Sequence, residues 1–152
     1  MTLCHKLVLT NMTVCHIFKM VMFLIKRIVV AGCRNYNDYS EAKEFIDFCI
    51  KNIKNKYTLV FISGGCTGAD SLGERYAKEN SYTTKYYPAE WNKYGKSAGP
   101  KRNEKMAKVG DYVICFWDGK SRGTKSMIEY AKKFNKPIRI KYIKSPLYGG
   151  GV

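Results

Sequence analysis

Phe61-Ile62-Ser63-Gly64-Gly65-Cys66-Thr67-Gly68-Ala69-Asp70 is an apolar run that passes through a glycine-rich turn directly into a helical pattern. Glycine lets the backbone approach an anion closely. The free N–H groups of a helix's first turn, with the positive end of the helix dipole, favour negative charge at that place. The segment therefore predicts a phosphate-binding turn between a strand and a helix.

A second turn of the same kind lies further along the chain, in the segment Trp117-Asp118-Gly119-Lys120-Ser121-Arg122-Gly123-Thr124. It follows an apolar run over 112–117 and precedes a helix predicted to begin near Thr124. This turn also carries Arg and Lys side chains. Two turns that favour anions in one small domain predict a nucleotide ligand.

The segments around these turns alternate between strand and helix patterns. The predicted strands are Arg27–Ala31, Thr58–Ser63, Tyr82–Tyr87, Asp111–Trp117 and Pro137–Tyr142. The predicted helices run from an N-cap at Ser40 to about Ile53, over Ala69–Glu79, from Pro100 at a first helical position to Val109, and over Thr124–Phe134. Such alternation predicts an α/β fold with a mainly parallel sheet of five or more strands and helices on both faces.

The unusual loops all follow strands. They are Gly32–Asn35, Gly64–Asp70, Pro88–Asn103, which contains the long irregular segment Pro88–Gly99, and Asp118–Thr124. Ligands of open parallel sheets bind beyond the carboxyl ends of the strands, where the chain order reverses. We therefore expect these four loops to meet at one binding site.

Composition bounds the class of protein. The 152 residues suit one domain, and 27 Lys and Arg against 12 Asp and Glu give a formal net charge of +15. This balance favours an anionic partner, either a nucleotide, a nucleic acid or a membrane surface, although a solvated lysine-rich surface accounts for part of it. The six cysteines form no C-x-x-C pair, which is typical of a reduced, cytoplasmic protein.

The two ends differ from the middle. We expect an extension over 1–26, one domain over 27–144 and a tail over 145–152, with translation starting natively at Met20 or Met22. Polar residues interrupt the apolar patches of the extension, so no membrane span is predicted. The pairs Cys4-His5 and Cys15-His16 match no common zinc spacing, so no metal site is predicted.

Standard nucleotide fingerprints are missing, because the turn after the first predicted strand has one glycine, Gly32, and the turn after the second has no lysine at the P-loop position. The chain instead resembles the SLOG superfamily of Rossmann-like domains, in its YspA-like (DUF2493) branch. The residues that carry the resemblance are Gly64–Asp70, Pro88-Ala89-Glu90-Trp91, Tyr94–Asn103, and Phe116–Gly119 with Ser121-Arg122-Gly123-Thr124. They extend over a domain from Arg27 to about Tyr142.

The resemblance implies a three-layer Rossmann-like domain with a pocket for a nucleotide or nucleotide-derived ligand, such as ADP-ribose or a cyclic nucleotide signal. We expect a sensor or sequestering protein that needs no other cofactor and forms a homo-oligomer. Related branches include phosphoribohydrolases that cleave N-glycosidic bonds, which is the alternative function. Their second glycine motif is followed by paired glutamates, whereas Thr124 is followed here by Lys125-Ser126-Met127. Single-stranded nucleic-acid binding is the third possibility, since lysines cluster near Trp91 and Tyr94.

Roles for individual residues follow as hypotheses. Backbone amides of the two turns, the Ser121 and Thr124 hydroxyls and nearby arginines would hold phosphate, aromatic rings would stack on a base, and Asp70 or Asp118 would accept from ribose hydroxyls. Asp70 as a helix cap, Trp117 as core and Arg102 in solvent are the structural alternatives. The predicted binding residues are Gly32, Arg34, Gly64, Gly65, Thr67, Gly68, Asp70, Trp91, Lys96, Arg102, Asn103, Trp117, Ser121, Arg122, Gly123 and Thr124. The predicted catalytic residues, if the protein is a hydrolase, are Glu90 and Asp118.

Overall fold

The computed structural model describes residues 14–21 and 24–144 of the chain. Its strands are β1 (Ile25–Gly32), β2 (Thr58–Ser63), β3 (Thr83–Tyr86), β4 (Tyr112–Trp117) and β5 (Ile138–Tyr142). Its helices are α2 (Tyr39–Ile50), α3 (Ala69–Glu79), α4 (Trp91–Tyr94), α5 (Ala98–Val109) and α6 (Arg122–Lys133), with a 3₁₀ turn over Gly95–Ser97. The predicted α/β class is confirmed.

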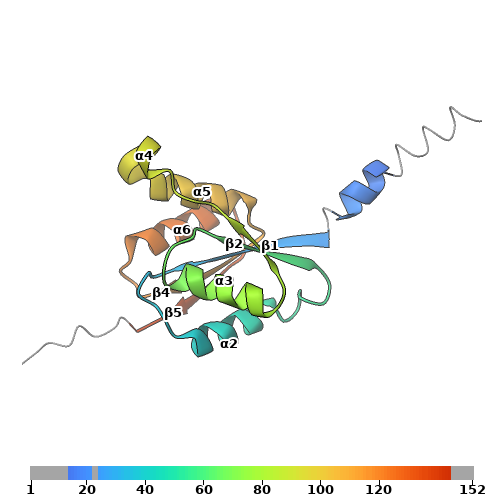
Figure 1. The fold of residues 1–152 in the computed structure, drawn as a ribbon, viewed down its shortest axis with the longest axis horizontal. Coiled ribbons are helices and arrows are strands. Elements are labelled where there is room, and N and C mark those ends of the chain that lie inside the picture. The colour runs from blue at the N-terminus through green and yellow to red at the C-terminus, as the bar shows by residue number, and fades with distance from the viewer. Residues whose placement is uncertain (1–13, 22–23, 145–152) are drawn as a thin grey trace, which may run out of the picture.

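The five strands form one parallel sheet in the order β3-β2-β1-β4-β5 (Figure 1). From β1 the chain first builds outward through β2 to β3, and it then crosses back to place β4 on the other side of β1. The chain order therefore reverses between β1 and β4. Ligands of open α/β sheets bind at this position, beyond the carboxyl ends of the two strands.

The sheet separates two layers of core, because successive side chains of a strand point to opposite faces. On one face Ile28 and Val30 of β1 pack with residues of α2 and α3. On the other face Val29 and Ala31 pack with residues of α5 and α6, including Met106. The predicted arrangement, with helices on both faces, is thus confirmed. Loops at the carboxyl ends of the strands connect the two helical layers.

Two predicted helix starts are wrong. The N-cap of α2 is Asp38 and not Ser40, since the Asp38 carboxylate accepts a hydrogen bond from the Glu41 amide at 2.9 Å. Helix α6 begins at Arg122, two residues before the predicted start at Thr124. In both cases the helix extends further towards the carboxyl ends of the strands than the apolar periodicity indicates.

The long loop after β3 is also more regular than predicted. Residues 91–94 form the short helix α4, and the 3₁₀ turn that follows leads directly into α5. Pro100 is the third residue of α5 and not the first. Proline is tolerated there because the first N–H groups of a helix have no partner within the helix.

Residues 14–21 form a helix that stands clear of the sheet ahead of β1 (Figure 1). Its apolar side chains, among them Ile17 and Phe18, are exposed. No helix within 14–21 and 24–144 is long and apolar enough to cross a membrane, and no cluster of metal-ligating side chains occurs in these ranges. Cys4, His5 and Met22 lie outside the described residues, as does the predicted tail.

Candidate functional site

A cavity of about 420 Å³ opens at the point where the chain order reverses, and we call it the switch-point cavity. Loops after β1, β2 and β4 and the first half of α5 form its walls. Nine of the predicted binding or catalytic residues line it, namely Gly32, Arg34, Asp70, Arg102, Asn103, Asp118, Ser121, Gly123 and Thr124. The expected meeting of the strand-end loops is therefore present in the fold.

Asp70 is the buried acid of this cavity, with 6% of its surface exposed. It is the second residue of α3, and its carboxylate accepts a hydrogen bond from the Cys66 amide at 3.3 Å. Burial raises the pKa of Asp70 to about 6, although the Cys66 amide and the nearby Arg102 act in the opposite direction. The cavity thus holds a carboxyl group that titrates close to neutral pH.

Arg102 reaches the same region from α5. Its guanidinium donates to the Gly64 carbonyl at 2.7 Å and lies 3.6 Å from the Cys66 sulfur. A Cβ built on Gly64 would lie 2.4 Å from the guanidinium, so the absence of a side chain at Gly64 lets Arg102 approach. The alternative that placed Arg102 in solvent is wrong, because its charge lies over the first glycine turn.

Asp118 holds the second turn in shape. One of its carboxylate oxygens accepts hydrogen bonds from the amides of Lys120 at 2.9 Å and Ser121 at 2.8 Å. These bonds, that of Ser121 above all, lower the pKa of Asp118. The indole N–H of Trp117 donates to the Ser121 carbonyl at 3.1 Å. The turn that leads into α6 is therefore fixed by the two residues that precede it.

The amino end of α6 opens into the switch-point cavity. The Ser121 side chain makes no capping hydrogen bond, and within the described chain the first three amides of α6, those of residues 122–124, have no acceptor. Asn103 fixes the position of this end by donating to the Gly123 carbonyl at 3.1 Å. A Cβ added at Gly123 would meet no atom within 4 Å. Gly123 and Thr124 line the cavity, so an anion inside it can reach the amides of these two residues.

The glycine turn after β2 is organised differently. The Gly65 amide donates to the Ser63 hydroxyl at 3.0 Å, and the Cys66 amide donates to Asp70. The amide of Ala69, the first residue of α3, donates to the Cys33 carbonyl at 3.1 Å. Three of the amides around this turn therefore already have acceptors inside the protein.

A second cavity, of about 530 Å³, adjoins the first, and we call it the Trp91 cavity. It shares Arg34, Cys66 and Arg102 with the switch-point cavity. The predicted residues Gly64, Gly65, Thr67 and Trp91 also line it. Tyr86, Pro88 and Ala89 complete its walls.

The other predicted residues lie outside both cavities. Glu90 is exposed and lines a separate hollow with Tyr94 and Lys101. The residues that line neither cavity are Gly68, Lys96, Trp117 and Arg122. The Trp117 ring packs 5.9 Å from that of Tyr142, and its N–H donates to the Ser121 carbonyl.

Several lining residues are absent from the list of predicted binding and catalytic residues. In the switch-point cavity they are Ala31, Cys33, Asn35, Cys66, Met106 and Met127, and in the Trp91 cavity Tyr86, Pro88 and Ala89. Cys33 and Cys66 each follow a strand, and this position was the available signal. The two methionines lie on helix faces whose apolar spacing equally predicts core.

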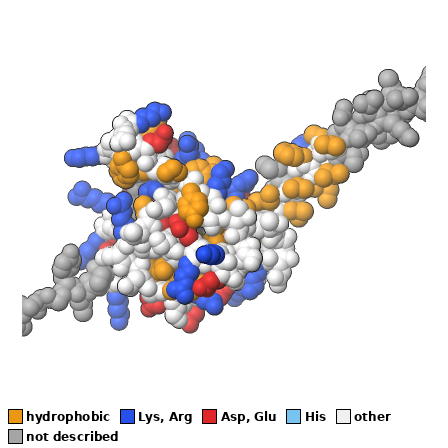
Figure 2. Space-filling model, in the orientation of Figure 1, with side chains coloured by type: hydrophobic (Ala, Val, Ile, Leu, Met, Phe, Trp, Pro, Cys, Tyr) orange, Lys and Arg blue, Asp and Glu red, His pale blue; other side chains and the backbone are white. Residues whose placement is uncertain are grey.

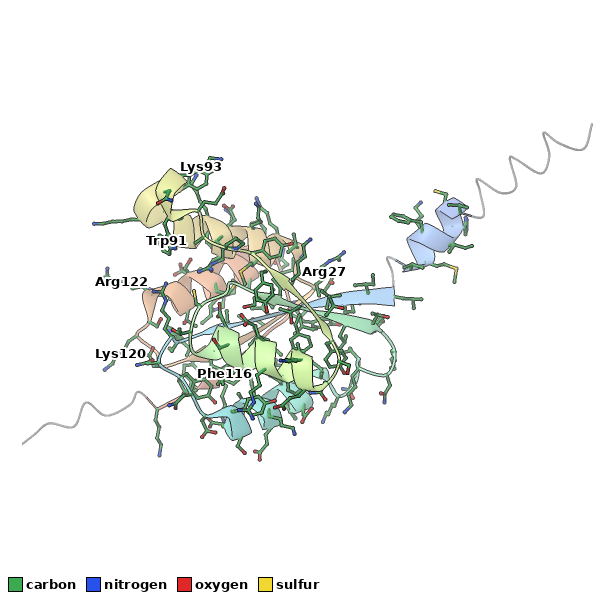
Figure 3. The ribbon with its side chains drawn as sticks, in the orientation of Figure 1. Arg27, Trp91, Lys93, Phe116, Lys120 and Arg122 are labelled. Carbon is green, nitrogen blue, oxygen red and sulfur yellow. The ribbon has the colours of Figure 1, made fainter. Side chains whose placement is uncertain are left out.

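Basic side chains surround this edge of the molecule. Lys and Arg side chains project from the left side of Figure 2. In Figure 3 the labelled Trp91, Lys120 and Arg122 lie on that side, whereas Arg27, near the start of β1, lies to the right. The carboxyl ends of the strands thus meet a positive surface, which attracts anions over a distance.

The chain is similar to a phage protein in sequence and to solved structures in fold. The chain is 28% identical over 120 residues to the Gene 61 protein of Mycobacterium phage D29, covering 75% of this chain and 94% of the phage protein. Its fold matches DNA processing protein A from Streptococcus pneumoniae with a TM-score of 0.60 and 21% identity, over 85% of this chain and 54% of that one. The chain thus spans about half the length of the pneumococcal protein.

A second solved structure, that of the protein TM1055, matches with a TM-score of 0.54 and 20% identity, over 74% of this chain and 72% of that chain. These two likenesses are likenesses of fold, and they confirm the Rossmann-like architecture. Residues 26–94 match the family described as the YspA, cpYpsA-related SLOG family. That range contains the first glycine turn and the Pro88–Trp91 motif, and the match confirms the resemblance of this part of the chain to the YspA-like SLOG branch.

Proposed function

We propose that the protein binds a nucleotide or nucleotide-derived ligand in the switch-point cavity, as a sensor or sequestering protein. One observation carries the proposal: the first three amides of the twelve-residue helix α6 have no acceptor in the described chain, and two of these residues, Gly123 and Thr124, line a cavity of about 420 Å³. Free amides and the positive dipole end of a helix favour a phosphate at this place.

The surroundings of α6 suit the rest of such a ligand. Arg34 and Arg102 line the same cavity and supply charge for further phosphate oxygens. The buried carboxyl group of Asp70 is an acceptor for ribose hydroxyls. The match of residues 26–94 to the SLOG family model, a family that the sequence resemblance connects with nucleotide-derived ligands, agrees with this assignment.

The positions of the two acids that were predicted to be catalytic favour binding without hydrolysis. Asp118 is committed to the amides of the β4–α6 turn, and the hydrogen bonds that lower its pKa keep it ionised. Glu90 is exposed and lines a different hollow. Neither arrangement supplies a free carboxyl group in the cavity that would receive the phosphate.

Hydrolysis of an N-glycosidic bond is the second candidate function, and one observation favours it. Asp70 lies in the switch-point cavity with its pKa raised to about 6, which suits a general base near neutral pH. The hydrolase would therefore use Asp70 in place of the predicted Glu90 and Asp118. Free base released from AMP by the wild type, but not by Asp70→Asn, would establish this function.

The test of the proposal is calorimetric titration of the full chain with AMP, ADP, ADP-ribose and cyclic nucleotides, together with analysis of the solution for free base. Gly123→Asp places a carboxylate among the free amides of α6, where there is open space, so we expect it to fold normally and to abolish binding. Lys132→Gln changes the net charge equally at the exposed far end of α6 and is expected to bind as the wild type does. Equal affinity of Gly123→Asp and wild type would overturn the proposal.

Salt dependence separates this function from nucleic-acid binding. A polynucleotide that neutralises several Lys and Arg side chains releases counterions, so its affinity falls steeply as salt rises. A nucleotide held in a cavity responds mildly. Steep loss of affinity for a single-stranded oligonucleotide, with no binding of mononucleotides, would favour the third possibility.

A further inference from the structure

The Trp91 cavity has no role in the phosphate site proposed above, yet its walls suit a planar group. Trp91 and Tyr86 line it with 51% and 56% of their surfaces exposed. Exposed aromatic rings beside basic side chains are a common surface for stacking nucleobases, and Arg34 and Arg102 line the same cavity.

The two cavities share part of their walls. Arg34, Cys66 and Arg102 line both of them. Arg102 is held in place by its hydrogen bond to the Gly64 carbonyl at 2.7 Å. A ligand that enters both cavities therefore passes two arginines, which is where a second anionic group would be stabilised.

Helix α5 fixes the spacing between the Trp91 ring and the amino end of α6, which are the two ends of the path through both cavities. A Cβ built on Gly99 would lie 3.4 Å from the Trp91 ring, and Asn103 donates to the Gly123 carbonyl of α6 at 3.1 Å. Gly99 and Asn103 are four residues apart, which corresponds to about 6 Å along the helix axis. Arg102 lies between them in the sequence. The Trp91 ring and the amino end of α6 are thus both positioned by one rigid element.

We propose that the Trp91 cavity is the base subsite of the ligand whose phosphate lies at α6, so that the ligand is a nucleoside diphosphate or a sugar derivative of one. One phosphate contacts the amides of α6, the next lies against Arg34 and Arg102, and the base stacks on Trp91. This inference rests on the proposed function, since it assigns the remainder of the same ligand.

The chain contains two tryptophans, and each reports on one end of the path. Trp91 lines the base subsite, and the indole of Trp117 donates to the Ser121 carbonyl at the start of α6. The variant Trp117→Phe leaves Trp91 as the sole tryptophan emitter, and Trp91→Phe leaves Trp117. Each variant is titrated with ribose 5-phosphate, AMP, ADP and ADP-ribose, and affinities are measured in parallel by calorimetry.

We expect ADP and ADP-ribose to quench the emission of Trp91, and ribose 5-phosphate to leave it unchanged. Trp91→Ala should weaken ADP binding by roughly 5- to 150-fold, the range for loss of one stacked base, and leave ribose 5-phosphate binding unchanged. Phe48→Ala removes a comparably exposed ring on α2, with 54% of its surface exposed, and should bind ADP as the wild type does. Thermal unfolding of each variant confirms that it is folded.

The outcomes separate the two proposals. If ADP binds with an affinity that does not depend on Trp91 and leaves the Trp91 emission unchanged, the base lies elsewhere. This inference is then overturned while the proposed function stands. If ADP binds no more tightly than AMP, the second phosphate has no site at the arginines and the diphosphate assignment is wrong. If calorimetry detects no binding of any of the four compounds, the proposed function fails and the inference fails with it.

Discussion

The two glycine turns of this protein look alike in sequence and differ in what their amides do. In the β2–α3 turn, the amides of Gly65, Cys66 and Ala69 donate to acceptors within the protein. In the β4–α6 turn, the first three amides of α6 have no acceptor in the described chain. The amide of the first residue of α3 is therefore already bonded within the protein, whereas the amide of the first residue of α6 has no acceptor in the described chain.

This difference arises from the neighbours of each turn. The β2–α3 turn packs against the loop after β1, where the Cys33 carbonyl accepts from α3. In the β4–α6 turn, the Ser121 amide donates to Asp118 and the Trp117 indole donates to the Ser121 carbonyl. These bonds do not involve the first amides of α6. A glycine-rich turn before a helix is therefore an anion site only where the tertiary structure leaves its amides without acceptors.

The largest expected effect is the difference in protein stability between a substitution in the β2–α3 turn and one in the β4–α6 turn. Gly68 has a φ of +78° and ψ of −129°, and a Cβ there would lie 2.2 Å from the Cys33 carbonyl oxygen. Backbone strain and overpacking together predict that Gly68→Ala lowers the free energy of unfolding by about 2–6 kcal/mol. Gly123→Ala, which meets open space, should change it by less than about 0.5 kcal/mol. Urea denaturation measures both, and equal stabilities would contradict the distinction between the turns.

The next effect concerns the pH dependence of stability. The folded-state pKa of Asp70 is raised from 3.8 to about 6, so the folded state holds the proton more tightly than the unfolded state does. Stability is therefore lost as pH rises from about 4 to about 6, by up to about 3 kcal/mol, and the loss is complete above that range. Asp70→Asn should remove this loss.

The measurement is denaturation of wild type and Asp70→Asn at about pH 4 and about pH 7.5. We expect the difference in unfolding free energy to shift in favour of Asp70→Asn at the higher pH, because its amide bears no charge in the buried site. Asn retains an oxygen that accepts from the Cys66 amide. Parallel pH profiles of the two proteins would show that Asp70 is not perturbed by its burial.

The smallest effect concerns Arg122. Its side chain is exposed and lies outside both cavities, so it acts on a bound anion only across solvent. We expect Arg122→Ala to weaken ADP binding by no more than about threefold, with the difference disappearing at high salt. Lys120→Ala in the same turn is the matched control and should behave alike. A loss of tenfold or more, specific to Arg122, would show that its guanidinium contacts the ligand.

The sequence predicted the sheet well for a physical reason. Buried parallel strands are short apolar runs, and β2 and α3 begin and end where their patterns indicate. The start of α2 was less predictable, because Asp38 and Ser40 are equally good N-cap residue types and the sequence alone does not distinguish them. The capping hydrogen bond from the Glu41 amide to Asp38, which decides between them, is seen only in the folded chain.

The site was predicted in its location and less well in its parts. Loops that follow parallel strands must gather at one edge, so the position of the switch-point cavity follows from the alternation of elements. Which groups are free depends on contacts between distant segments. Arg102 bonds a carbonyl 38 residues away, and the Trp117 ring packs on Tyr142. Such contacts leave no local pattern in the sequence.

The most direct test of the account is an amide chemical-shift titration of the ¹⁵N-labelled protein with ADP. Hydrogen bonds to phosphate should shift the amide signals of Gly123 and Thr124 most strongly, whereas those of Gly65 and Cys66, which already have acceptors, should move little. Strong shifts at Gly65 and Cys66 with an unchanged α6 would contradict the assignment of the phosphate to the second turn.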